Sequence, residues 1–489
     1  MTERSLYKAT PWLSSLPPGP MSELIESAPS SLGGNIRRIL RLAWPVFVGQ
    51  IAVLAYGTVD TLLVARVSPE DLAALAIGMS VYITIFIGFM GVVLAISPTV
   101  GQLYGARKPS AAGEQVHQAV WIALALSILG SSLLLFPEPL LALAQPTAEV
   151  RAKVQAYLSA LAVSLPAALL FTVYRGFNNA ISRPKAVMVL QLLGLLVKIP
   201  LSTMAVMGVP AWGLPALGVE GCGWATAVAM WTQLALAWWW MRRDSHYLPF
   251  ELWNRGLHRP HLASLKGLLR LGLPMGMSIL VEVTGFSLMA LFIARTGGLA
   301  VAGHQVAINV VTLMFMMPMA LANATSTLVA QRVGASDVVD ARRLGWHGLL
   351  LGAGIATALG LMVHLSPQQI VALYTPDAAI AAAALPLLTW VALFHVADAI
   401  QTVAAFVLRA WRVATVPMLI YVAALSGVGL GGGYMLAFNV SGNIPVSWQG
   451  AQGFWISSTL GLMIAAVAMV SLMAWTLRVQ GQRLKPAAA

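Results

Sequence analysis

Apolar stretches of membrane length recur along almost the whole chain. A helix needs about 20 mainly apolar residues to cross the hydrocarbon core of a bilayer. Twelve runs of roughly this length or longer are separated by short charged segments: about 39–65, 72–101, 115–136, 155–176, 186–208, 218–241, 266–295, 300–331, 344–365, 384–408, 415–438 and 452–477. We therefore expect an all-α polytopic membrane protein with twelve transmembrane helices, some tilted or continuing as helix beyond the bilayer.

The charge distribution predicts the topology. Only 9% of the 489 residues are charged, whereas a soluble domain has about 25%. If the N-terminus is cytoplasmic, 24 of the 29 Lys and Arg fall in or beside cytoplasmic segments, four (Arg66, Arg151, Lys153 and Arg295) fall on the outer side, and Lys198 lies inside a run. This is the positive-inside pattern of a plasma-membrane (inner-membrane) protein with both termini in the cytoplasm. The net charge of +12 then reflects topology and does not indicate a nucleic-acid partner.

Several classes of site have no support in the sequence. The single cysteine, Cys222, excludes an internal disulfide and a cysteine-based metal site. The glycine-rich stretch 427–433 contains a GxGxxG pattern, but it lies inside an apolar run, where close helix packing is expected instead of phosphate binding. No ATP-binding motif is present, so we expect no cofactor and no ATPase partner.

The two halves of the chain are related by one constant shift along the sequence. This shift places Arg41-Leu42-Ala43-Trp44-Pro45 on Arg270-Leu271-Gly272-Leu273-Pro274, and Ser97, Val100, Gln102 and Gly105-Ala106 on Ser326, Val329, Gln331 and Gly334-Ala335. We expect two six-helix lobes, 36–241 and 266–478, related by a pseudo-twofold axis along the membrane normal. A connector at 242–265 joins them, and cytoplasmic tails at 1–35, which we expect to be disordered, and at 479–489 flank them.

Transporters built from such repeats bind substrate near the membrane midplane and alternate access by moving one lobe against the other. Pro45 and Pro274 lie near the starts of the first helix of each lobe. Proline removes a backbone hydrogen bond and bends a helix. The two residues predict either a bendable, moving helix or a static kink that shapes packing.

Three carboxylates lie deep inside the apolar runs: Asp60, Glu282 and Asp398. A charged side chain at the centre of a bilayer costs at least about 2.5–3.5 kcal/mol, so such residues are rare and usually functional. Glu282 is 12 residues from Arg270 and Asp398 is 11 from Arg409, which corresponds to ~18 and ~17 Å along two helices. Acids at one depth are able to share a proton or bind Na⁺; the alternative is two unrelated acids bonded to the backbone.

The N-terminal half also contains Lys198, the one Lys or Arg that lies deep inside a run and not near its end. It lies 10 residues from Gly208 at the outer end of its run, and Asp60 lies 6 from Arg66, a depth difference of ~6 Å. An unpaired ammonium at mid-membrane is costly, so we expect an ion pair between Lys198 and Asp60. The alternative is that Lys198 extends into a water-filled cavity. Tyr56 is one turn before Asp60 on the same face, where its hydroxyl is predicted to hydrogen-bond the acid.

Five segments, in order, resemble one known family. They are YGTVDTLLVARVSPEDLAALAIG (56–78), GCGWATA (221–227), LGLPMGMSILVEVTGFSLMALFIARTG (271–297), AGHQVAINV (302–310) and VADAIQTVAAFVLRAW (396–411). They are similar to the multidrug and toxic compound extrusion (MATE) family, and most to its NorM-type branch, over about residues 36–478. The resemblance implies cation-coupled export of bulky organic cations.

The resemblance also carries residue roles. Asp60 matches the family's N-lobe carboxylate, and Glu282 and Asp398 match the C-lobe acids that NorM-type members use for cation coupling, by H⁺ or Na⁺. Two departures stand out. Phe394 occupies the position of a tyrosine one turn before the C-lobe aspartate, which removes a hydroxyl ligand for Na⁺. Lys198 and Ser202 stand where similar proteins commonly carry asparagines.

Three functions compete at this point. The first is a secondary multidrug antiporter for small organic drug-like substrates, driven by protons or sodium. The second is a related flippase or carrier for lipid-linked or polyanionic cargo, which favours a basic cavity. The third is an intramembrane enzyme, which requires converging catalytic groups that the eight scattered histidines do not supply.

Overall fold

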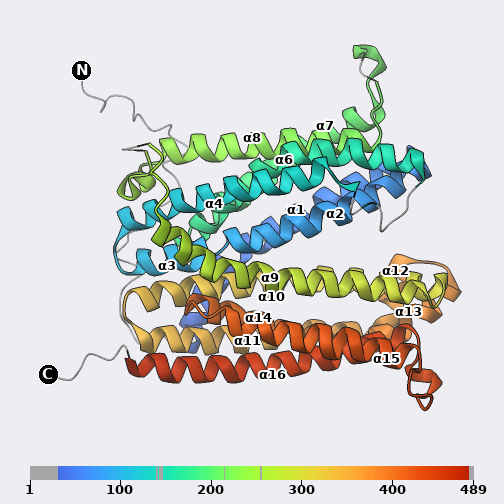
Figure 1. Ribbon diagram of the computed structural model, residues 1–489. Helices are drawn as coiled ribbons and strands as arrows, with labels where there is room; N and C mark the ends of the chain where they lie inside the picture. The colour runs from blue at the N-terminus through green and yellow to red at the C-terminus, as the bar shows by residue number, and fades with distance from the viewer. Residues whose placement is uncertain (1–30, 139–140, 142–146, 214, 254–255, 484–489) are drawn as a thin grey trace.

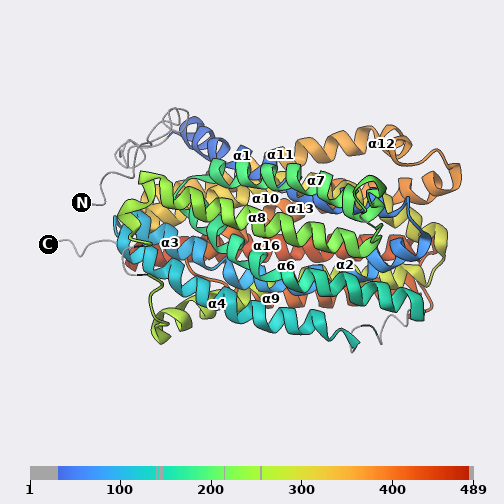
Figure 2. The ribbon, with the colours of Figure 1, turned by 90° about the horizontal axis from the view of Figure 1, so that it is seen from above.

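The chain forms a bundle of long helices in a computed structural model (Figures 1 and 2). The structure describes residues 31–138, 141, 147–213, 215–253 and 256–483; most of the predicted N-terminal tail lies outside these residues. The first half contains α1 (Leu32–Val64), α2 (Pro69–Val93), α3 (Ile96–Gly105), α4 (Pro109–Leu135), α6 (Ala148–Ala180), α7 (Pro184–Met207), η2 (Pro210–Trp212) and α8 (Val219–Arg243).

The connector and the second half follow the same plan. They contain η3 (Ser245–Phe250), α9 (Leu262–Ala294), α10 (Gly298–Gly334), α11 (Val338–Leu365), α12 (Pro367–Tyr374), α13 (Ala378–Ala410), α14 (Thr415–Tyr421), the π-helical segment η4 (Val422–Gly432), α15 (Gly433–Ala437), η5 (Val446–Trp448) and α16 (Ala451–Arg483). The expected all-α architecture with twelve bundle helices is confirmed, with α2–α3 and α14–α15 each counted as one.

Eleven of these helices, among the described residues, are long and apolar enough to cross a membrane. The twelfth, α8, lies beside them in the bundle (Figure 1). Its sequence contains five tryptophans and ends in Arg242 and Arg243, which lowers its mean hydropathy. Both arginines stack on this aromatic surface, with the guanidinium of Arg242 4.1 Å from the ring of Trp238 and that of Arg243 4.7 Å from Trp239.

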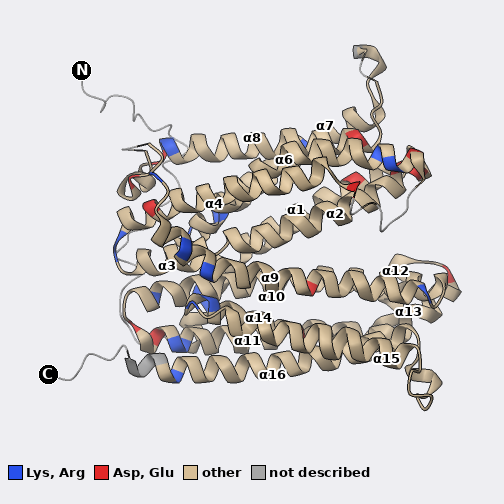
Figure 3. Ribbon diagram, in the orientation of Figure 1, with Lys and Arg blue, Asp and Glu red and all other residues tan. Residues whose placement is uncertain are grey.

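Several predicted boundaries need correction. Helix α1 begins at Leu32, inside the tail predicted for 1–35, because Ser31 caps it by accepting a hydrogen bond from the backbone N–H of Gly34. Helix α16 continues to Arg483, inside the tail predicted for 479–489. Most Lys and Arg gather at the end of the bundle where both termini lie (Figure 3).

The predicted connector is not a free linker between the lobes. Its Tyr247 hydroxyl donates to Asn178 Oδ1 at 2.6 Å, and Asp244 accepts from Arg183 Nη1 at 2.6 Å. Farther along, His117 Nε2 lies 3.0 Å from the carbonyl oxygen of Leu252. The connector is therefore fixed to α4 and α6 of the first lobe.

Each lobe's first helix starts against the opposite lobe. Ile39 and Ala43 of α1 are buried in a cluster of side chains from α10, α11, α13 and α16, whereas Val64 at the other end belongs to the core of the first lobe. Leu268 of α9 is likewise buried in the first lobe's core. Pro45 and Pro274 lie inside these two helices, in the part of each helix that packs against the opposite lobe.

Two glutamines join the lobes at the end that carries the termini. Gln102 Nε2 of α3 donates to the carbonyl oxygen of Ala410 at 2.8 Å. Gln331 Nε2 of α10 donates to the carbonyl oxygen of Ala180 at 2.7 Å and to Ser182 Oγ at 2.9 Å. The constant shift that relates the two halves places one glutamine on the other, so the two contacts repeat each other.

Two glycines bring the backbones together at the same place. A Cβ atom on Gly105 would lie 1.8 Å from the carbonyl oxygen of Gln331, and one on Gly334 would lie 1.8 Å from that of Gln102. Only glycine allows such an approach. We call Gln102, Gly105, Gln331 and Gly334 the clasp.

Candidate functional site

The N-lobe carboxylate is paired with a lysine. Asp60 of α1 and Lys198 of α7 are both buried, and Lys198 Nζ lies 2.9 Å from Asp60 Oδ2. The ammonium also donates to Thr226 Oγ1 of α8 at 2.6 Å, and Ser202 Oγ donates to Asp60 Oδ1 at 3.3 Å. The ion pair expected from the depths of the two residues is present, and its charges neutralise each other inside the lobe.

Tyr56 does not make the predicted hydrogen bond to Asp60. Its hydroxyl is buried without a hydrogen-bond partner, and it lies where a Cβ on Gly194 of α7 would be 2.2 Å away. The ring therefore occupies the space that a glycine leaves on α7. Its face meets the base instead, with Lys198 Nζ 5.6 Å from the ring centroid.

Sequence reasoning missed Thr226. It lies in the GCGWATA segment, which indicated the family but no role for a single residue. Its hydroxyl donates to the carbonyl oxygen of Cys222 at 2.8 Å, so its oxygen lone pair is free to accept from Lys198. The available signal was that Thr226 is a polar residue inside an apolar run, in the same half of the chain as the buried Lys198.

Glu282 of α9 lies at a small cavity in the other lobe. The cavity measures about 30 Å³ and is lined by Glu282, Gly285, Phe286, Met289, Phe394, Leu425, Gly429, Leu430, Ser458 and Leu462. Among the described residues no hydrogen bond or ion pair to the Glu282 carboxylate is found, and its side chain is partly exposed. A volume of this size holds about one water molecule or a small ion.

Asp398 of α13 is held by a chain of buried hydrogen bonds. Gln401 Nε2 donates to Asp398 Oδ1 at 2.9 Å and lies 3.1 Å from Thr402 Oγ1. The hydroxyl of Tyr421, the last residue of α14, donates to Gln401 Oε1. All four side chains are buried. Neither Gln401 nor Tyr421 was predicted from the sequence, although Gln401 lies three residues after Asp398 on the same helix face.

Asp398 and Arg409 lie within electrostatic range of Glu282. Arg409 is buried near the end of α13. The guanidinium of Arg409 lies 4.3 Å from the ring centroid of Phe406. We call Glu282, Asp398, Gln401 and Tyr421 the C-lobe acid site; it has two carboxylates and no ion pair within the described residues.

Phe394 lines the cavity as an apolar wall. Its ring centroid is 6.0 Å from that of Phe286 and 5.3 Å from that of Trp455. No hydroxyl is thus available at this position. The neighbouring His395 is fully buried without a hydrogen-bond partner and is not among the cavity residues.

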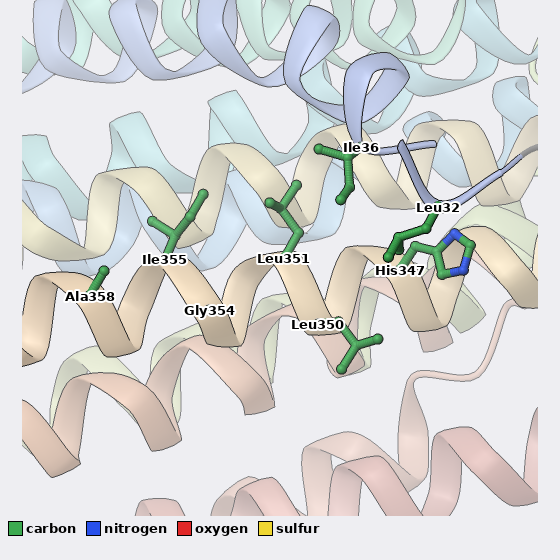
Figure 4. A pocket seen from close by; sticks show the side chains of 8 residues that line it. All are labelled: Leu32, Ile36, His347, Leu350, Leu351, Gly354, Ile355 and Ala358. Carbon is green, nitrogen blue, oxygen red and sulfur yellow. The ribbon is translucent and has the colours of Figure 1, made fainter. Parts of the chain in front are cut away.

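A larger, apolar groove lies away from all three acids. It measures about 330 Å³ between the start of α1 and α11, and it is lined by Leu32, Ile36, His347, Leu350, Leu351, Gly354, Ile355 and Ala358 (Figure 4). His347 Nδ1 is 3.0 Å from Asn35 Nδ2, which fixes the histidine to α1. The groove has no carboxylate and does not resemble a cation site.

Comparison with known proteins identifies the class of this molecule. The family model MatE matches residues 45–204 and again residues 274–435, once on each side of the connector. The probable multidrug resistance protein NorM of Aromatoleum aromaticum is 38% identical over 457 residues, which cover 94% of this chain and 97% of that protein. The multidrug resistance protein PmpM of Pseudomonas aeruginosa is 35% identical over 436 residues, covering 89% and 90%.

The fold agrees with solved structures. The eukaryotic MATE transporter AtDTX14 superposes with a TM-score of 0.82, covering 93% of this chain and 99% of that one at 18% identity. The family model, the relatives and the membrane-length helices together indicate a multi-pass membrane transporter. The chain belongs to the MatE family, and relatives that match most of its length are named as multidrug resistance proteins, NorM among them.

Proposed function

We propose that this protein is a secondary multidrug efflux transporter that exports bulky, often cationic compounds in exchange for protons, with coupling at Glu282 and Asp398. The relatives that cover most of the chain are named as multidrug resistance proteins. In this proposal Asp60 is a structural residue. The alternative coupling ion, Na⁺, would bind at the same two acids.

The difference between the two lobes carries this proposal. A coupling residue must gain and lose a cation during the cycle. Lys198 Nζ lies 2.9 Å from Asp60, so an incoming ion would have to displace an ammonium of the same chain that is paired with no other carboxylate among the described residues. Glu282 has no such partner and lies at a cavity. Its charge is therefore free to change.

The size and lining of the cavity favour protons. Na⁺ requires several oxygen ligands, and among the residues that line the cavity the side-chain oxygens belong to Glu282 and Ser458 alone. Phe394 supplies a ring where a hydroxyl ligand would stand. A proton requires one carboxylate and, at most, a water molecule.

The two other candidate functions have less support. Lipid-linked or polyanionic cargo would favour a basic cavity, but Arg409 is the one base within electrostatic range of Glu282 among the described residues. An intramembrane enzyme needs converging catalytic groups, and no cluster of three His, Cys, Asp or Glu occurs among the described residues.

Alternating access would require the lobes to separate at the clasp, which joins them at the end that holds both termini. We assign this end to the cytoplasm of a plasma-membrane protein because Lys and Arg gather there (Figure 3). The bends expected at Pro45 and Pro274 would let α1 and α9 follow both lobes. A cysteine in place of the exposed Leu248, in a Cys222→Ala background, should react only with reagents that enter the cell; labelling from outside intact cells would refute this orientation.

The purified protein in lipid vesicles tests the proposed function. A fluorescent aromatic cation is supplied, and either a proton gradient or a sodium gradient is imposed. We expect substrate movement only with the proton gradient, and none with Glu282→Gln. Movement driven by sodium alone would change the coupling ion, and movement with neither gradient would reject secondary antiport.

A further inference from the structure

Gln401 and Tyr421 link Asp398 to a different helix from its own. Asp398 and Gln401 belong to α13, whereas Tyr421 ends α14. The exposed fractions are 4% for Asp398, 0% for Gln401 and 3% for Tyr421, so bulk water does not compete for these hydrogen bonds. The Gln401 amide connects the two other residues: its nitrogen donates to Asp398, and its oxygen accepts from the hydroxyl of Tyr421.

Tyr421 stands where the helix changes its geometry. The next residues, Val422–Gly432, form a π-helix, a rare geometry that is frequent at functional sites. Leu425, Gly429 and Leu430 of this segment line the cavity at Glu282. The same short segment therefore forms one wall at the first acid and is anchored, through Tyr421 and Gln401, to the second.

We propose that Tyr421 and Gln401 are positioning residues that set the ion affinity of Asp398. This inference rests on the proposed coupling role of Asp398 and Glu282. The N–H of Gln401 favours the ionised carboxylate, and Tyr421 fixes the amide so that the N–H and not the oxygen faces the acid.

Few other titratable or charged groups lie near Asp398. Those in electrostatic range are Glu282 of α9 and Arg409 of α13, and the buried His395 lies one turn before Asp398 on the same helix. Helices α3, α10, α11, α12 and α16, which pack against α13, add no charged group to this set in the part of the chain described.

The test uses Tyr421→Phe and Gln401→Met in the full-length protein in vesicles, with proton-driven transport of an aromatic cation followed across pH. We expect Tyr421→Phe to move the pH of half-maximal transport upward by about 0.5–1 unit, because the carboxylate loses support for its ionised form. Tyr434→Phe is the matched control, since its ring packs on Phe292 and Phe438 and its hydroxyl has no hydrogen bond among the described residues.

A double-mutant cycle separates positioning from packing. If Tyr421 acts through Gln401, then Tyr421→Phe should cause no further shift in a Gln401→Met background. Additive shifts, or a wild-type pH profile for Tyr421→Phe, would overturn the inference. Wild-type protein without proton-driven transport would instead reject the proposed function, and melting temperatures of all variants identify any that fail to fold.

Discussion

The two lobes share a skeleton but differ at their carboxylates. Both use a glutamine and a glycine at equivalent positions of the clasp, and both begin with a proline-containing helix that starts on the other lobe. In the N-lobe, however, Asp60 forms an ion pair with Lys198. In the C-lobe, the helix at 415–437 contains no charged residue, and Glu282 lies at a cavity. The two halves of the chain thus share the contacts that join the lobes, but they differ in their buried charged residues.

The largest expected effect is on transport by the C-lobe acids. Glu282→Gln or Asp398→Asn should reduce gradient-driven efflux to the level of empty vesicles, because a neutral side chain cannot exchange an ion. Binding of the organic substrate, measured by equilibrium dialysis, should remain. Glu70→Gln, at an exposed acid of α2, is the control and should transport normally. Undiminished efflux in both C-lobe variants would remove the distinction between the lobes.

The next largest effect concerns stability of the N-lobe. Lys198→Met or Asp60→Asn alone should lower the free energy of unfolding in detergent by roughly 3–5 kcal/mol, since each leaves a buried charge without its partner. The double variant should recover most of this loss. If the two single losses simply add in the double variant, the buried pair does not exist in the membrane protein.

The smallest effect should be equal in the two lobes. Gly105→Ala and Gly334→Ala each force a methyl group against a backbone carbonyl, and we expect a loss of about 1–3 kcal/mol in unfolding free energy for each. Gly354→Ala is the matched control, because nothing lies within 4 Å of its added Cβ. A clearly unequal pair of losses would show that the clasp is not symmetric.

The sequence predicts what depends on regular helix geometry. Depth along a helix follows from a rise of about 1.5 Å per residue, which is why the pairing of Lys198 with Asp60 was foreseeable. The all-α fold follows from the apolar runs, and the repeat follows from the single constant shift that places Gln102 on Gln331.

Contacts that depend on how a neighbouring helix packs could not be predicted from the sequence. Tyr56 lies on the predicted face of α1, but its hydroxyl occupies the space beside Gly194 of α7 and makes no hydrogen bond to Asp60. Tyr421 reaches Gln401 from a different helix, 20 residues later in the chain. The glycines of 427–433 indicated close packing, but not that the backbone becomes π-helical there.

The most direct test of the account is proton-driven efflux by the double variant Asp60→Asn/Lys198→Met. This variant removes both charges of the N-lobe pair and leaves the C-lobe acid site unchanged. If coupling lies in the C-lobe, the purified variant should transport an aromatic cation in response to a proton gradient within about threefold of the wild-type rate, because the predicted stability loss is largely recovered. A folded double variant that is as inactive as Glu282→Gln would contradict the assignment and make Asp60 part of the coupling machinery.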